Sequence, residues 1–351
     1  MTKGNGLHNL IIFLIMALLI IGCGKTEGNQ IVVLNMGFNK NEVFKLENQV
    51  CTLPEVMVYL NTAQNKYESV YGEGIWDVEA NGISMKANVK DNALADISQI
   101  KAMNILAESQ GVALSNEEAE LAKAAATDYF ASLSSHERDF LGVDEDILTQ
   151  MYSEYALAHK INAEIIKDIN PEISDDEARN ITVLHILLKT YTTDGTGQMV
   201  EYSQKDIDEL NQKAQQIHEL ALDGEHDFAD LVFEYSEADP SELSFGHGEM
   251  DPIFEETAFD LGKDEISEVI RTQYGFHIIK CISTFNREQT EINKLRIAEE
   301  QKELAFDEKY DEFAKGLKVF LNEKLWDSVE VVYDEQTVSS DFFDIYNKHF
   351  Q

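Results

Sequence analysis

The sequence has little cysteine, with three in 351 residues. So few thiols exclude a disulfide framework, and the absence of a CxxC pair excludes a cysteine-rich zinc site. Cys51 and Cys281 lie far apart in the sequence, which does not by itself decide whether they are joined. The nine histidines are scattered without the spacing of metal ligands, so we expect neither a metal site nor a cofactor.

Basic residues are also scarce, with 28 Lys and Arg against 65 Asp and Glu, for a net charge of −37. Phosphate contacts need clustered Lys or Arg, so nucleic acid is excluded as a partner. Acidic runs such as SNEEAE are typical of solvated helix starts, and the simplest interpretation of the charge is solubility. A second interpretation is that the acidity attracts basic unfolded polypeptides and repels anionic wall polymers.

Long hydrophobic runs are missing too. The apolar run from Leu10 to Ile21 is too short to span a bilayer comfortably but suits a signal-peptide core. It ends in LIIGC, which resembles a bacterial lipobox and implies cleavage after Gly22 and diacylation of Cys23. The sequence thus predicts a lipid anchor on the extracytoplasmic face of a bacterial cell membrane, and Gly24 suits a Gram-positive surface. The alternative is an ordinary signal with a chance cysteine.

What the sequence does contain is enough apolar side chains for globular cores, at 44% hydrophobic residues with 18 Phe and 13 Tyr. Residues 29–48 predict a strand, a turn and the start of a helix. A mainly helical region follows, in which Thr52 and Ser115 each open a capping box. The expected helices run from Thr52 to Gly72, 88 to 110, 115 to 133 and 144 to 169.

The pattern changes after residue 180 to a compact α+β unit over residues 181–284. Each of two β-rich runs, ITVLHILLK and TQYGFHIIKC, has one histidine at its centre, His185 and His277. Strand alternation places His277 on the face of Ile279, opposite Phe276. A lone histidine there is usually a satisfied core residue, but two such strands suggest a pair. His218 and His247 are expected at the surface or in loops.

The C-terminal part predicts one helix of about forty residues from Arg287 to Trp326, followed by a short strand, VEVVY. This tail is too small to bury its own apolar stripe. We therefore expect it to pack on the N-terminal helices, with the middle unit inserted between two halves of one helical domain.

Four segments in order, VLHILLK, GEHDFADLVFEYS, GEMDPIFEETAFDL and EISEVIRTQYGFHIIK, resemble a parvulin-type peptidyl-prolyl isomerase domain over nearly its full length. With the lipobox and the flanking helices, the chain resembles the extracytoplasmic foldases of the PrsA and SurA kind. The resemblance implies an α+β fold, in which a parvulin domain with an antiparallel sheet is inserted into a helical chaperone core. The implied divisions are a signal peptide at 1–22, chaperone segments at 23–178 and 286–351, and the parvulin domain at 179–285.

The same resemblance implies the site. Leu243, Met250 and Phe254 would line a pocket for the proline ring, the last two on one helical turn. His185 and His277 would form a hydrogen-bonded pair beneath it, with Thr272 nearby. Rotation about an X-Pro bond has a barrier of about 18–20 kcal/mol and breaks no bond, so catalysis needs only tighter binding of the twisted amide.

The loop YSEADPSELSFGHGEM departs from the family pattern. Ala238 or Asp239 could take its polar position, and ELSFG stands where GGDLG is expected. Two functions follow: an isomerase acting on X-Pro bonds of exported proteins, or a non-catalytic holdase with a degenerate parvulin domain. The loop from Tyr191 to Tyr202 has no Lys or Arg, so phosphoserine-proline selectivity is not expected. A homodimer is left open.

Overall fold

The protein is represented by a computed structural model that describes residues 37–80, 82–195, 198–331 and 341–350. The chain divides into two compact units. The first unit comprises the described residues up to Asp168 and from Ala305 onward, and the second unit comprises Ile169–Leu304. A mainly helical unit made of both ends of the chain, with a second unit inserted, confirms the predicted fold class.

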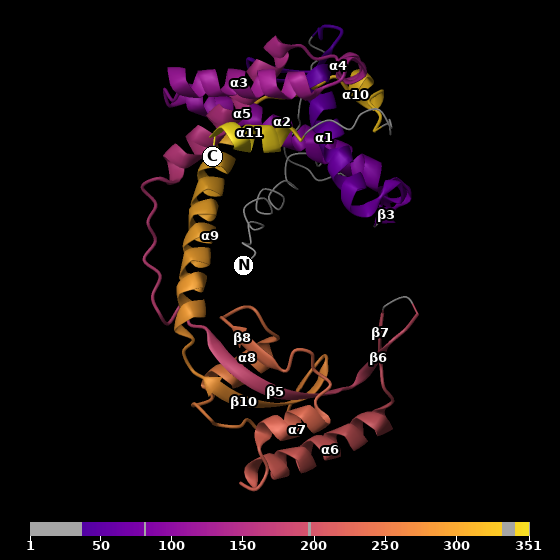
Figure 1. Cartoon of the computed structure of the whole chain (residues 1–351), viewed down its shortest axis with the longest axis vertical. Coiled ribbons are helices and arrows are strands. Elements are labelled where there is room, and N and C mark those ends of the chain that lie inside the picture. Colours follow the sequence, from indigo (N-terminus) through magenta and orange to yellow (C-terminus); the bar gives the residue numbers. More distant parts are fainter. Residues whose placement is uncertain (1–36, 81, 196–197, 332–340, 351) are drawn as a thin grey trace. The chain divides into compact units, whose positions relative to one another are not determined.

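The first unit is a bundle of helices (Figure 1), and it also contains a small antiparallel sheet. Its two N-terminal capping boxes are present as predicted, since Glu55 and Glu118 each close back on the N-cap residue. Phe342, in the last helix, is completely buried among aromatic rings of the bundle. The helices are α1 (Leu53–Tyr71), η2 (Glu73–Asp77), α2 (Met85–Ser109), α3 (Asn116–Ser132), α4 (Ser135–Leu141), α5 (Glu145–Ile166), α10 (Glu323–Asp327) and α11 (Phe342–Phe350), and a two-stranded ladder joins β3 (Glu79–Ala80) to β4 (Ile83–Ser84).

The sheet of the first unit corrects two sequence predictions. Residues expected to start a helix form β1 (Glu42–Leu46), which pairs with β2 (Gln49–Thr52) and with β11 (Val319–Leu321) in the order β11-β1-β2. The long C-terminal helix therefore ends early, with α9 at Arg287–Ala314, because the chain leaves it to pair with the edge of β1. The strand predicted at 329–333 is also wrong for residues 329–331, and the rest of it lies outside the described residues.

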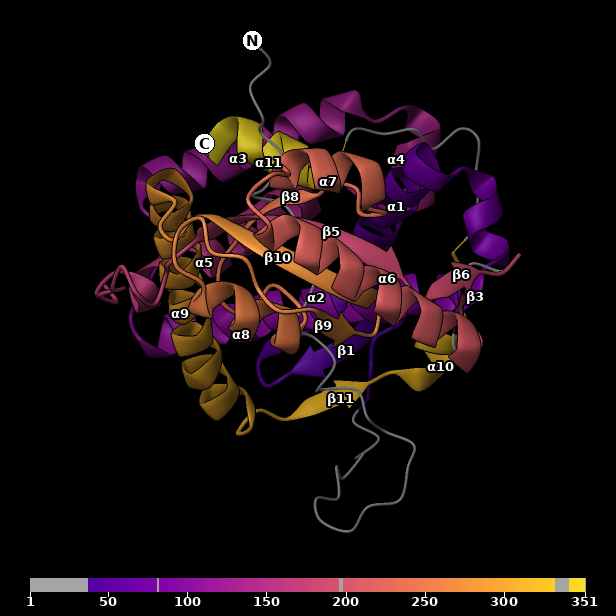
Figure 2. The same ribbon diagram turned by 90° about the horizontal axis from the view of Figure 1, so that it is seen from below.

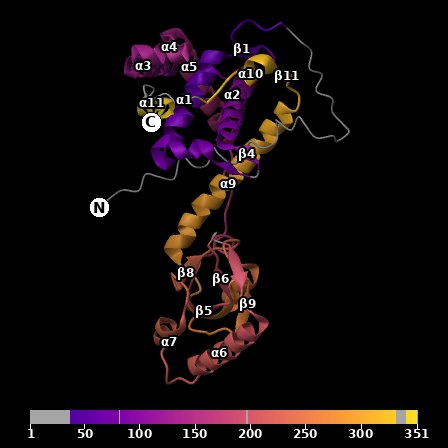
Figure 3. The same cartoon turned by 90° about the vertical axis from the view of Figure 1, so that its right-hand side faces the viewer.

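The second unit is built on an antiparallel sheet of order β8-β5-β10-β9. Its strands are β5 (Ile181–Lys189), β8 (Glu242–Phe245), β9 (Ile270–Thr272) and β10 (Gly275–Ser283). Figures 2 and 3 show α6 (Gln204–Leu222) and α7 (Phe228–Tyr235) together on one face of this sheet. A separate hairpin, β6 (Tyr191–Thr193) and β7 (Met199–Glu201), and α8 (Pro252–Asp260) complete the unit.

The two faces of this sheet carry different cores, as strand alternation predicts. Phe276 and Ile278 pack with α6 and α7. Ile279 packs on the other face, with Val183 and with Phe254 of α8. Across the described parts of the chain, no helix is both long and apolar enough to cross a membrane.

Candidate functional site

The two central strands of the second unit bring His185 and His277 together on the face covered by α8. Their ring centroids are 5.7 Å apart, and the side chains are only 4% and 5% exposed. Phe254 of α8 meets both rings edge-on, at 5.3 Å from His185 and 5.2 Å from His277. The structure therefore places two imidazoles and one phenyl ring in a single buried cluster.

The turn before β10 sets the position of Thr272. Gly275 has φ of +143°, and a Cβ at this position would stand 2.1 Å from the backbone oxygen of Leu188, so the close approach of β10 to β5 requires glycine. The turn brings Thr272 Oγ1 within 2.9 Å of His277 Nε2. The same hydroxyl oxygen accepts the Tyr274 amide at 3.1 Å, which leaves its own proton free for the imidazole.

Burial keeps the two imidazoles neutral. It lowers the pKa of each from 6.5 to about 4; the neighbouring His185 lowers that of His277 further, and Asp251 opposes this. Neither Nδ1 atom has a hydrogen-bond partner among the described residues. The predicted hydrogen bond between the two histidines is therefore wrong, because His277 bonds Thr272 through Nε2 and its Nδ1 faces no acceptor.

The predicted apolar residues border the same cluster. Leu243 of β8 and Met250 are partly buried and pack against the core that contains Phe254. Contrary to prediction, Met250 does not share a helical turn with Phe254, because α8 starts only after its N-cap residue Asp251. Met250 instead ends the turn 246–250, where Glu255 accepts the Gly248 amide at 2.9 Å and the Met250 amide at 3.3 Å.

Asp239 lies in the loop between α7 and β8. Asp239 is exposed, and its side chain makes none of the described contacts that join the remaining six. Sequence reasoning missed Ser236, whose hydroxyl accepts the Leu187 amide at 3.2 Å and lies 3.3 Å from the carbonyl oxygen of His185. The Ser236 hydroxyl thus holds the loop against the β5 backbone beside His185. In the sequence, the only indication of this contact is a serine at the end of a short helix.

The arrangement limits the chemistry that this cluster can perform. It contains no thiol or paired carboxylates to act as nucleophile or base, and its imidazoles are neutral and nearly inaccessible. Here the apolar side chains form the rim of the cluster, and the neutral, buried imidazoles form its rigid floor. Such a site suits tighter binding of an uncharged ring in one conformation than in another, which requires no covalent step.

Comparison with known proteins points to the same segment. Residues 185–283 match the PPIC-type PPIase domain, the rotamase family. A foldase protein PrsA of Caldanaerobacter subterraneus is 28% identical over 260 residues, covering 71% of this chain and 76% of that protein. PrsA 2 of Listeria monocytogenes is 43% identical over 75 residues, which cover 19% of this chain and 25% of that protein. The crystal structure of PrsA from Bacillus cereus aligns with a TM-score of 0.36 and 19% identity, covering 76% of this chain and 97% of that one.

Proposed function

We propose that this chain, a PrsA/SurA-like protein with a parvulin-type domain, is a protein-folding factor that catalyses cis-trans isomerisation of X-Pro peptide bonds. The observation that carries the proposal is the buried cluster of His185, His277 and Phe254, bordered by Leu243 and Met250. All five lie within the segment that matches the PPIase family.

The chemistry follows from the amide bond. Twisting an X-Pro bond removes its resonance, at a barrier of about 18–20 kcal/mol, and it weakens the charge separation of the amide. Leu243, Met250 and Phe254 hold the proline ring in an apolar contact that excludes water, which favours the less polar twisted state. His185, His277 and Thr272 act beneath this rim as a neutral floor, and the Thr272 hydrogen bond fixes the orientation of His277.

The location and partners are also part of the proposal. Cys23 lies outside the described residues, and we propose that it is diacylated and anchors the chain on the outer face of the cell membrane. The substrates would then be unfolded or partly folded exported proteins. We further propose that residues 23–178 and 286–351 act as one chaperone core around a parvulin domain at 179–285, and we leave a homodimer open.

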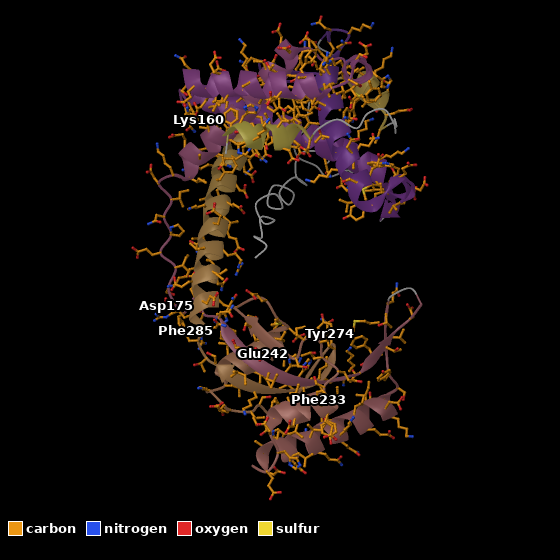
Figure 4. The ribbon with its side chains drawn as sticks, in the orientation of Figure 1. Lys160, Asp175, Phe233, Glu242, Tyr274 and Phe285 are labelled. Carbon is orange, nitrogen blue, oxygen red and sulfur yellow. The ribbon has the colours of Figure 1, made fainter. Side chains whose placement is uncertain are left out.

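The first test is cis-trans exchange in an Ala-Pro-Phe peptide, measured by NMR with the full chain. Phe254→Leu should lower kcat/KM at least about tenfold, because a smaller side chain leaves the ring poorly held. Phe233→Leu is the matched control, since Phe233 lies 94% exposed on α7 (Figure 4). Equal effects of the two substitutions, or no acceleration by the folded wild type, would overturn the proposal and leave the holdase function to be tested.

Asp239 is tested separately. We propose that it supplies the polar group of the loop, as its family position implies, in the conformation that binds substrate. Asp239→Ala should then lower kcat/KM, while Asp239→Asn should retain most of it. A wild-type rate for Asp239→Ala would remove this residue from the site.

A further inference from the structure

The turn 246–250, which carries Met250, is packed closely against α9. A Cβ added at Gly246 would stand 2.6 Å from Nδ2 of Asn293 and 3.3 Å from Oε1 of Glu249. These separations are shorter than ordinary van der Waals contact, so the turn and the helix fit only because residue 246 has no side chain. Figures 1 and 3 show the start of α9 beside β8, which leads into this turn.

Hydrogen bonds hold the Asn293 side chain in place at this contact. Its side chain is buried, and Nδ2 donates to the Ala178 carbonyl at 3.0 Å. Its Oδ1 accepts from Arg296, at 2.9 Å from Nε and 2.6 Å from Nη2. With both ends of the amide bonded, the group cannot rotate away from Gly246 without losing hydrogen bonds in a buried place.

Arg296, also of α9, makes a second, looser contact with the turn, 3.8 Å from Glu249 Oε1. The turn also contacts α8, where Glu255 accepts the amides of Gly248 and Met250. The turn therefore lies between α9 and α8, and the position of Met250 depends on both.

We infer that Asn293 of α9, supported by Arg296, is a positioning residue for the isomerase pocket, which it sets through Gly246 and the turn that carries Met250. Both residues lie beyond the segment 185–283 that matches the PPIase family, so the catalytic unit extends into α9. The inference rests on the proposed isomerase function.

The test uses substitutions in the full chain. Asn293→Ala should lower kcat/KM for an X-Pro peptide about tenfold, mainly through KM, because a displaced Met250 holds the ring less well in every state. It should also shift the Met250 methyl signal in NMR spectra. Arg296→Ala should have a smaller effect in the same direction, since its pair with Glu249 is half exposed. Gln301→Ala is the matched control, because it truncates an amide on the same helix whose contact, with Glu177, lies away from the turn.

A second pair of variants separates positioning from a general loss of stability. Gly246→Ala should lower kcat/KM by forcing the turn away from Asn293, and Asn293→Ala in the same chain should restore part of the loss by removing the obstacle. Gly195→Ala, where nothing lies within 4 Å of the added Cβ, should change neither readout.

Two outcomes would overturn the inference: additive losses in the double variant, or an unchanged Met250 signal in Asn293→Ala. The NMR readout does not require turnover. An inactive wild type whose Met250 signal still shifts in Asn293→Ala would therefore contradict the proposed function and leave the contact established.

Discussion

Each unit contains one buried cluster of polar side chains, and the two clusters differ in how their polar atoms are paired. In the first unit Lys101 is fully buried, and its Nζ lies 2.6 Å from Glu55 and 2.7 Å from Glu154. In the second unit the Nδ1 atoms of His185 and His277 have no hydrogen-bond partner among the described residues. A buried charge must be compensated for the chain to fold, whereas a neutral group without a partner is tolerated where function requires it. The contrast therefore fits a structural role for the cluster around Lys101 and the proposed functional role for the histidine pair.

The ion cluster of the first unit connects several helices. Glu55 closes the capping box of α1 by accepting the Thr52 amide at 2.6 Å, and its other oxygen binds Lys101 of α2. Glu154 comes from α5. One ammonium group thus ties three helices together, and its loss should be felt in the stability of the whole unit.

The largest effect should come from Lys101→Met. Removing the cation leaves the buried Glu55 carboxylate and the partly buried Glu154 carboxylate without compensation, which costs about 3–5 kcal/mol. Both tryptophans of the chain, Trp76 and Trp326, lie in the first unit. Tryptophan fluorescence during unfolding in urea therefore reports this unit, and the midpoint should fall sharply with little change in slope.

Lys160→Met is the control for that loss. Lys160 also pairs with a glutamate, Glu118 at 2.6 Å, but the two side chains are 28% and 31% exposed. Such a pair contributes about 1 kcal/mol or less. If both lysine substitutions lowered the free energy of unfolding equally, burial would not be what distinguishes the cluster around Lys101.

The second effect is a pH dependence of the second unit. Burial holds the pKa of His185 and His277 near 4, below the value of about 6.5 expected in the unfolded chain. The unfolded state therefore binds more protons between these values, so stability is complete above about pH 6.5 and falls as the pH drops toward 4. The loss is at most about 3 kcal/mol for each histidine.

Hydrogen exchange of the β5 and β10 amides at pH 7 and pH 5 measures this loss in the second unit alone. Carboxylates titrate in the same range, so the comparison is with a chain in which both histidines are replaced by glutamine. That variant should lose less stability between the two pH values than the wild type. An identical loss would mean that the imidazoles are not held neutral by burial.

A smaller effect is expected in the rate. Because both imidazoles stay neutral down to about pH 4, kcat/KM for an X-Pro peptide should be nearly constant between pH 8 and pH 5. The NMR exchange measurement gives this profile directly. A fall in kcat/KM centred near pH 6.5 would show that an accessible histidine with an ordinary pKa takes part in the reaction. The proposal that buried, neutral imidazoles line the pocket would then be wrong.

Short-range periodicity in the sequence predicted which residues share one face of a strand. Alternation along β10 placed His277 with Ile279 and opposite Phe276, and the structure has them so. Helical periodicity alone could also have corrected one error, the expected exposure of His218. His218 was expected at the surface, yet it lies on the buried side of α6 at helical spacing from Ala214 and Ala221, and is only 7% exposed.

One error and one omission involve contacts between distant residues. The pairing of Phe44 with Leu321 joins strands at opposite ends of the chain, so no local window could distinguish β11 from a continuing helix. Likewise, the contact of Asn293 with Gly246 crosses from α9 to the turn before α8. Family motifs located the histidines, but the support of the turn came from residues outside those motifs.

The smallest effect concerns Arg271, a cation next to Thr272 in the sequence. Because neighbouring residues of a strand face opposite sides, Arg271 lies over the Phe276 ring, on the α6 and α7 side, and its Nη2 is 2.9 Å from Glu201 Oε1. Its guanidinium group is therefore unavailable to bind an acidic side chain that precedes proline in a substrate.

Arg271→Ala should change the free energy of unfolding by less than about 1 kcal/mol. It should also leave the ratio of kcat/KM for Glu-Pro and Ala-Pro peptides unchanged, as should Glu201→Ala. A selective loss with the Glu-Pro peptide would place a cation at the pocket and end the description of its floor as neutral.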